Sequence, residues 1–158
     1  MKSACKAIPT GAENIIPHIV CAGADKAIEF YKQAFGAVEV HRIPAKDGKR
    51  IMHACLSIGG SMIYLNDDFP EFCGGKSFNP HALQGTAVTL HRYVEDCDAA
   101  IKKAVDAGAT IMMPPADTFW GDRYGIVIDP FGHRWSIATH LKDMTPEEIQ
   151  TAMKQFFG

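Results

Sequence analysis

The stretch PHIVCAGADKAI at residues 17–28 returns in outline as LHRYVEDCDAAI at residues 90–101. His18 and His91 are 73 positions apart, and so are the aspartates and isoleucines that follow them in each stretch. Further along, GSMIYL at 60–65 aligns with GHRWSI at 132–137. A similarity at a nearly fixed separation indicates two copies of one structural unit.

Each copy is predicted to form one strand, one helix and three further strands. In the first copy a helix capped by Asp25 and ended by Gly36 follows a β-rich segment. In the second copy the helix begins at Asp98 and stops at Gly108. The predicted strands are residues 15–21, 37–44, 50–58 and 61–66, then 86–94, 109–113, 123–129 and 134–140. We therefore expect an α+β fold of two tandem βαβββ modules.

The rest of the chain is assigned around these modules within a single domain. The modules span about residues 14–68 and 86–141, and the glycine- and proline-rich stretch 69–85 between them is expected to be a surface connection. Thr145 and Glu148 form a capping box for a closing helix over about 145–157. This helix carries its apolar residues in one stripe, so it packs on the domain itself or on a second subunit.

Composition excludes several classes of function. The 158 residues are 47% hydrophobic and carry a net charge of −2, which is typical of one globular domain. The chain has no basic block for nucleic acid or acidic membranes, and no signal or membrane-spanning segment, so a cytoplasmic protein is expected. Five scattered cysteines without a metal-binding spacing are expected to be reduced thiols.

Strand alternation indicates which side chains face a cavity. The helices cover one face of each curved, mixed sheet, so the opposite faces are free to enclose a pocket. The repeat places His18 and His91 at equivalent points of that pocket. Together they could hold one divalent ion such as zinc, nickel or manganese, or act as an acid–base pair without a metal. Each could equally be an ordinary, half-buried strand histidine.

Other side chains are candidates for substrate contact. Alternation places Tyr64, Asn66 and Ser136 on the pocket face, and His140 near its rim. Trp120 and Arg123 lie in a polar connection where an aromatic ring could stack on a ligand and a guanidinium could bind an anionic group. The alternative for this pair is a structural role, in which the loop packs and Arg123 forms a salt bridge with Asp122. Three further histidines are interpreted as strand, loop and turn residues: His53, His81 and His133.

Three motifs resemble those of the vicinal oxygen chelate superfamily, which includes glyoxalase I, bleomycin resistance proteins and extradiol dioxygenases. They are AIEFYKQAFGA at 27–37, WGDRYG at 120–125 and DPFGHRW at 129–135. The last motif, with the closing TPEE at 145–148, is similar to the PhnB-like branch. The resemblance covers about residues 14–150. It implies paired modules, commonly in homodimers, and a pocket that in metal-using members holds a divalent ion on the first and last strands of each module.

The chain departs from that pattern at the metal. The resemblance places the usual ligand positions on Ile16, Tyr64, Thr89 and Ser136, none of which is a histidine or a carboxylate. A displaced site would have to use the two repeat-related histidines, fewer than the three protein ligands of a catalytic zinc. No glycine-rich nucleoside-binding loop follows a first strand, so the methyltransferase label attached to the branch is rejected.

Three functions follow from these observations. The first is a metal-free protein that binds a small molecule in the sheet cavity, with no cofactor. The second is a divalent-metal-dependent lyase, isomerase or transferase that acts on a vicinal-oxygen substrate through His18 and His91. The third is a metal-independent enzyme that uses the same histidines for proton transfer, or a protein with a mainly regulatory role.

Overall fold

The computed structural model describes residues 5–158 and contains two four-stranded mixed sheets. The first module comprises β1 (His18–Val20), α1 (Ala24–Phe35), β2 (Val38–Pro44), β3 (Ile51–Ile58) and β4 (Ser61–Asn66), with sheet order β1-β4-β3-β2. The second comprises β5 (Thr89–Tyr93), α3 (Cys97–Asp106), β6 (Thr110–Asp117), β7 (Asp122–Ile128) and β8 (Arg134–His140), ordered β5-β8-β7-β6. The βαβββ repeat is confirmed.

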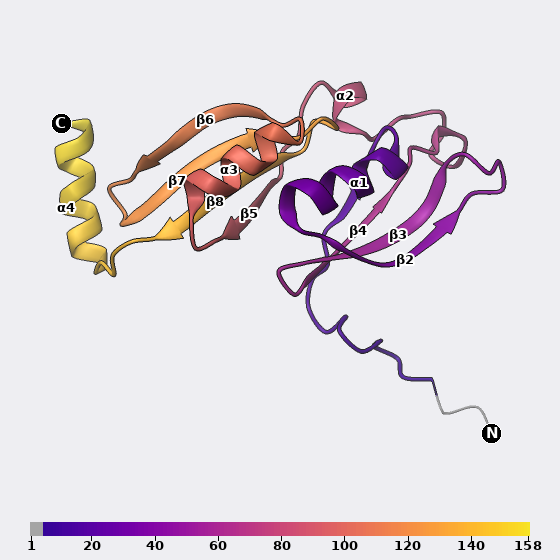
Figure 1. The fold of residues 1–158 in the computed structure, drawn as a ribbon, viewed down its shortest axis with the longest axis horizontal. Coiled ribbons are helices and arrows are strands. Elements are labelled where there is room, and N and C mark those ends of the chain that lie inside the picture. The colour runs from indigo at the N-terminus through magenta and orange to yellow at the C-terminus, as the bar shows by residue number, and fades with distance from the viewer. Residues whose placement is uncertain (1–4) are drawn as a thin grey trace.

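The repeat extends to strand register. β1 runs parallel to β4 and β5 runs parallel to β8, while the other pairs are antiparallel. Residues 69–85, expected to be a plain connection, contain a 3-10 turn at Pro70–Phe72 and the short helix α2 (Pro80–Leu83). The closing helix α4 (Pro146–Phe157) begins with the predicted capping box. It lies at the far end of the molecule (Figure 1).

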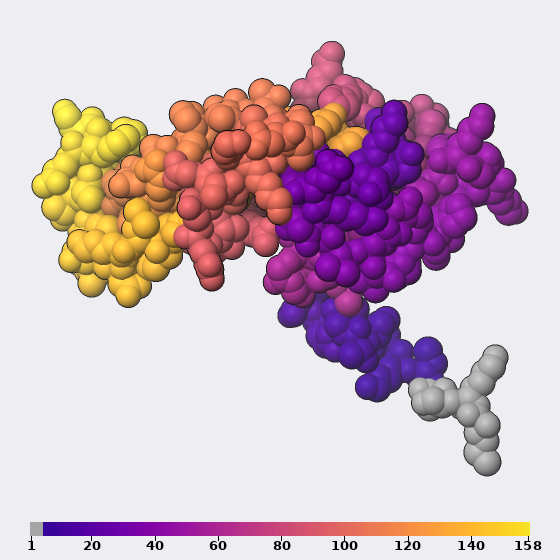
Figure 2. Space-filling model, viewed as in Figure 1, coloured from indigo at the N-terminus to yellow at the C-terminus, as the bar shows by residue number. Residues whose placement is uncertain are grey.

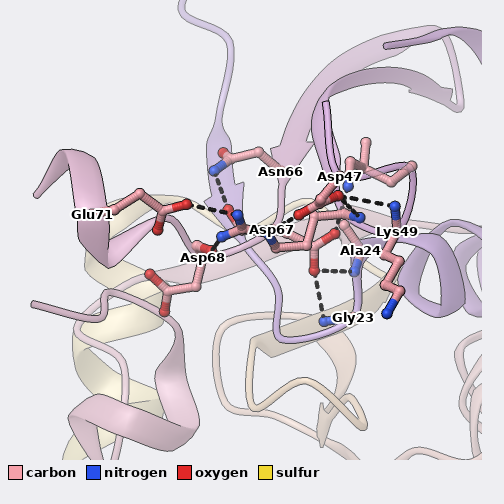
Figure 3. Close-up of polar contacts among 10 residues, drawn as sticks. Gly23, Ala24, Asp47, Lys49, Asn66, Asp67, Asp68 and Glu71 are labelled. Atoms are coloured by element: carbon pink, nitrogen blue, oxygen red, sulfur yellow. Dashed lines mark hydrogen bonds and ion pairs between the residues drawn. The ribbon is translucent and has the colours of Figure 1, made fainter. Parts of the chain in front are cut away.

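Both module helices begin before the predicted aspartates because their N-termini are capped from distant strands. The Oδ1 atom of Asp67, just after β4, accepts hydrogen bonds from the N–H groups of Gly23 and Ala24 at 2.9 Å each (Figure 3). Its Oδ2 accepts a third from the Ile51 N–H at 2.7 Å. At the equivalent place in the second module, the Thr139 hydroxyl accepts from the Cys97 N–H at 2.8 Å. Helix α3 also has a local cap, Asp96 rather than Asp98.

One hydrophobic core joins the two modules. The rings of Phe35 on α1 and Trp135 on β8 have centroids 4.4 Å apart, and Tyr31 lies 5.5 Å from the same Trp135 ring. Helices α1 and α3 also contact one another. The modules therefore lie side by side and in contact (Figures 1 and 2).

A buried carboxylate fixes this arrangement. Asp129, only 3% exposed, accepts hydrogen bonds from the Tyr31 hydroxyl at 2.7 Å and the Trp135 indole N–H at 3.0 Å. It also accepts from the backbone N–H groups of Phe131 and His133 at 2.9 Å each. The Nε2–H of His133 in turn donates to the Val20 carbonyl at 2.9 Å. Asp129 thus ties the first module's helix to the turn that starts β8.

The helices cover only one face of each sheet. Helix α1 packs on β2 and β3, and α3 packs on β6, β7 and β8. The fit of α3 on β7 is so close that a Cβ atom at Gly125 would collide with Ile101. We call the face of each sheet that lies opposite these helices its open face. Among residues 5–158, no helix has the length and apolar character needed to cross a bilayer.

Replacing Asp129 with alanine is expected to lower the free energy of unfolding by about 3 kcal/mol or more, because buried Tyr31 and Trp135 donors lose their acceptor. Urea unfolding followed by tryptophan fluorescence measures this loss. The control is Asp106→Ala, whose exposed ion pair with Lys102 contributes less than about 0.5 kcal/mol. Equal losses in the two variants would contradict the role given to Asp129.

Candidate functional site

A groove runs between β1 and β5, the two inner edge strands of the sheets. One cavity of about 490 Å³ has His18 and Val20 on one side and Leu90 and Arg134 on the other. A second, of about 570 Å³, is lined by Met62, His91 and other residues. Three residues line both cavities: Pro17 just before β1, Val88 just before β5, and Leu90 on β5. The two cavities are therefore neighbouring parts of one groove.

The open face of the second sheet carries an aromatic cluster that reaches this groove through His91. His91 lies edge-on to Tyr93 at 4.8 Å between ring centroids and is stacked with Tyr124 at 6.1 Å. The Trp120 ring continues the row, 5.6 Å from Tyr124. The His91 Nδ1 atom is hydrogen-bonded to the Ser136 hydroxyl at 2.7 Å. We call these five residues the aromatic face.

Ser136 orients the His91 imidazole and is not itself placed to react. The serine is only 2% exposed, so a ligand in the groove has little access to its hydroxyl. Because Nδ1 is engaged with Ser136, Nε2 is the His91 nitrogen left to bind a ligand. The cluster can therefore stack a flat group and offer it one fixed hydrogen-bonding nitrogen.

The open face of the first sheet carries a different group, which we call the histidine cluster. His53 lies 5.7 Å from His18, 5.2 Å from His41 and 4.8 Å from Tyr64, measured between ring centroids. The pKa of His53 lies below its usual value. Burial is the main cause, and the neighbouring His41 and His18 imidazoles add to it. The cluster therefore favours the neutral form of the His53 imidazole.

A buried carboxylate closes the outer end of the aromatic face. Asp122 accepts hydrogen bonds from the Tyr93 hydroxyl at 2.8 Å, the Trp120 indole N–H at 3.2 Å and His140 Nδ1 at 2.8 Å. The other ring nitrogen of His140 donates to Asp143 at 2.9 Å. Hydrogen bonds to Asp143 and then to Asp122 raise the pKa of His140 above its usual value.

The sequence candidates fall into three places. His18 and His91 both reach the groove, where the register pairs them with Tyr64 and Ser136, but they line different cavities. Trp120 and His140 lie at the outer end around the Asp122 carboxylate. Asn66 and Arg123 bind neighbouring groups of the protein itself.

Asn66 and Arg123 are occupied by neighbouring groups. The Asn66 side-chain amide donates to the Asp67 carbonyl at 2.6 Å. Arg123 alternates with Tyr124 along β7 and so lies on the helix-covered side, where it forms ion pairs with Asp98 and Asp117. The sequence also allowed a salt bridge between Arg123 and Asp122. Asp122 instead accepts hydrogen bonds from Tyr93, Trp120 and His140.

The donor set does not fit a divalent metal. Within residues 5–158 no group of three or more His, Cys, Asp or Glu side chains is arranged to hold an ion. His18 and His91 belong to separate clusters, and their strand partners are a tyrosine and a serine. The divalent ion that the resemblance implies therefore lacks its protein ligands here.

Three residues of the groove and the clusters are absent from the sequence-based candidates. His41 belongs to the histidine cluster, Tyr124 belongs to the aromatic face, and Arg134 lines the groove. Alternation along 134–140 already places Arg134 on the same face as Ser136, and the same alternation along 123–129 is the signal that would have placed Tyr124 there. His41 has no such signal, because a register shift between Glu39 and His41 breaks the alternation of β2.

Comparisons with known proteins agree with this fold. The sequence model of the Glyoxalase/Bleomycin resistance protein/Dioxygenase superfamily matches residues 15–137. The uncharacterized protein Mb0911c of Mycobacterium bovis is 50% identical over 137 residues, 87% of this chain and 90% of that protein. The structure of the Arabidopsis thaliana At5g48480 product is 30% identical with a TM-score of 0.63, covering 79% of this chain and 97% of that one. The fold also matches a Bacillus cereus PhnB protein described as a putative 3-demethylubiquinone-9 3-methyltransferase, with TM-score 0.60 and 18% identity, covering 80% of this chain and 99% of that one.

His53 in the histidine cluster and His140 at the outer end of the aromatic face are expected to have pKa values shifted in opposite directions from the usual histidine value of about 6.5. His140 should lose its proton above that value, so the stability it contributes is complete below pH of about 6.5 and is lost as the pH rises through its folded pKa. His53 should gain its proton only below that value, so its burial costs stability as the pH falls. NMR titration of the imidazole signals measures both.

Two variants serve as controls for this titration. Asp143→Asn should lower the pKa of His140 and leave His53 unchanged, while His41→Ala should raise the pKa of His53 alone. Identical pKa values for the two histidines in the parent protein would show that neither cluster forms in solution.

Proposed function

The chain belongs to the glyoxalase/bleomycin resistance protein/dioxygenase superfamily, and from that premise we propose that it binds a small organic molecule in the groove between β1 and β5. The observation that carries this proposal is the aromatic face beside two adjoining cavities of about 490 and 570 Å³. Cavities of roughly 300–1,000 Å³ lined mainly by apolar groups, with a few placed polar groups, are typical of small-molecule sites.

The groups around the groove indicate how a ligand is held. Tyr124 offers a flat surface for stacking, and His91, oriented by Ser136, offers a hydrogen bond through Nε2. Asp122 holds the Tyr93 hydroxyl and the Trp120 indole, which fixes two rings of the aromatic face before a ligand arrives. Fixed side chains reduce the entropy lost on binding. The site is therefore suited to a ligand with a flat ring.

The metal-dependent alternative is less well supported. It requires His18 and His91 to act on one ion, whereas they line different cavities and contact different clusters. Proton transfer by His91 alone needs no further ligand and is compatible with the binding proposed here. We also propose a cytoplasmic location, which the free cysteines, three of them buried, support.

We further propose that the protein functions as a homodimer. The outer strands β2 and β6 carry exposed apolar side chains, which single chains rarely leave in contiguous patches. They are Val38, Val40, Ile43, Ile111, Met112 and Met113. A second copy laid on these strands would cover them and enclose the open faces.

The dimer is tested by sedimentation equilibrium. The parent protein should sediment at twice its chain mass of 17.3 kDa, and Ile43→Glu with Met112→Glu should shift it to a single chain. Lys26→Glu, on the exposed side of α1, is the control and should remain dimeric. A parent protein that sediments as a single chain at all concentrations would refute the dimer.

Ligand-detected NMR with benzamide and indole as neutral aromatic probes tests the binding site. Tyr124→Ala should weaken probe binding about tenfold, roughly 1.4 kcal/mol, through loss of stacking and apolar contact. His91→Ala should weaken benzamide by about 1 kcal/mol through loss of one hydrogen bond. Phe72→Ala, a highly exposed ring on the connection between modules, should change nothing. Probes that bind Tyr124→Ala as well as the parent would exclude the aromatic face.

A further inference from the structure

Arg134 is the arginine that carries a buried side-chain nitrogen without a hydrogen-bond partner within residues 5–158. Three of the five arginines, Arg42, Arg50 and Arg123, each pair with two carboxylates, and Arg92 donates to the Phe35 carbonyl. The Nε atom of Arg134 is buried without any hydrogen-bond partner, the one such side-chain nitrogen or oxygen in the described chain.

The position of Arg134 directs its guanidinium group toward the groove. As the first residue of β8 it pairs with Thr89, and it alternates with Trp135, whose ring packs in the core under α1. Arg134 therefore shares the open face with Ser136, one strand repeat away. It lines both the groove cavity of about 490 Å³ and an adjoining cavity of about 410 Å³ beside α2.

The surroundings of Arg134 contain no negative charge to balance it. Neither of these two cavities has an aspartate or glutamate in its lining. A guanidinium group stays protonated at any physiological pH, so burial cannot neutralise it. Burying a donor without a partner is costly, and in native proteins the partner of such a group is commonly a bound ion, a ligand or a water molecule.

We infer that Arg134 is the anion-binding residue of the groove and that the natural ligand is a small organic anion with a carboxylate or phosphate group. The planar guanidinium group matches either group through two parallel hydrogen bonds. Arg134 and Ser136 are separated by about 7 Å along the strand. A ligand whose ring lies against His91 and whose anionic group reaches Arg134 is therefore compact. This inference rests on the proposed groove site and specifies its ligand class.

The first experiment uses inorganic phosphate and measures thermal unfolding against chloride at equal ionic strength. Phosphate should raise the Tm of the parent protein, and Arg134→Met should abolish that rise. Arg42→Met removes the same charge from a paired arginine and should keep the phosphate response. Arg134→Lys should keep part of it. A phosphate response that is absent in the parent, or unchanged in Arg134→Met, would overturn the inference.

The stability of Arg134→Met in chloride shows whether Arg134 binds a ligand or supports the fold. Methionine keeps much of the apolar stem of arginine, so without phosphate Arg134→Met should unfold at the same temperature as the parent or at a higher one, because a buried donor without a partner has been removed. A Tm well below that of the parent in chloride would show that Arg134 supports the fold and would count against a ligand role.

The second experiment compares 3-phenylpropionate with its neutral amide by calorimetry. The parent should bind the acid at least tenfold more tightly than the amide, and Arg134→Met should bind both alike. Equal binding of acid and amide to the parent would overturn the anion assignment and leave the groove site standing. Loss of all phenyl binding with an intact, Arg134-dependent phosphate response would support the anion assignment and count against the aromatic ligand.

Discussion

The fold depends on the buried Asp129 carboxylate, which receives donors from both modules at once. Tyr31 reaches it from α1 and Trp135 from β8, while two backbone N–H groups close the turn between β7 and β8. This single acceptor sets where β8 begins and how closely the two sheets approach. The groove between β1 and β5, and the place of Arg134 beside it, follow from that geometry.

The repeated sequence has produced two similar frameworks with different surfaces. Both modules place a histidine opposite the same strand position, paired with Tyr64 in one and Ser136 in the other. The neighbours of His18 are the His53 imidazole and the Tyr64 ring, while those of His91 are two tyrosines and a buried serine. The two sides of the groove therefore offer different chemistry, which suits a ligand with two unlike ends.

Much of this could be predicted from the sequence because it depends on local patterns. The strand and helix order, the alternation along β8 and the capping box of α4 all follow from residues close in the chain. The start of α1 could not be predicted, since its cap is Asp67, more than forty residues away. The ion pairs of Arg123 likewise depend on which side of β7 α3 covers, a property of the packed structure.

The histidine cluster could not be predicted from the sequence for a second reason. His18, His41 and His53 come from three strands and meet only through pairing register, which includes irregular steps in β2. The orphaned Arg134 nitrogen is similarly invisible in sequence, because it is defined by partners that the folded chain does not supply. Such a site depends on the contacts of the folded chain, so the sequence alone does not predict it.

If the groove between the modules is the ligand site, adding 3-phenylpropionate should change the backbone amide NMR shifts of the residues that line it. We expect the changes to concentrate on 18–20, 88–91 and 134–136, which line the groove or the aromatic face. Shifts confined to α1, α3 or the outer strands, with the groove unchanged, would contradict this assignment.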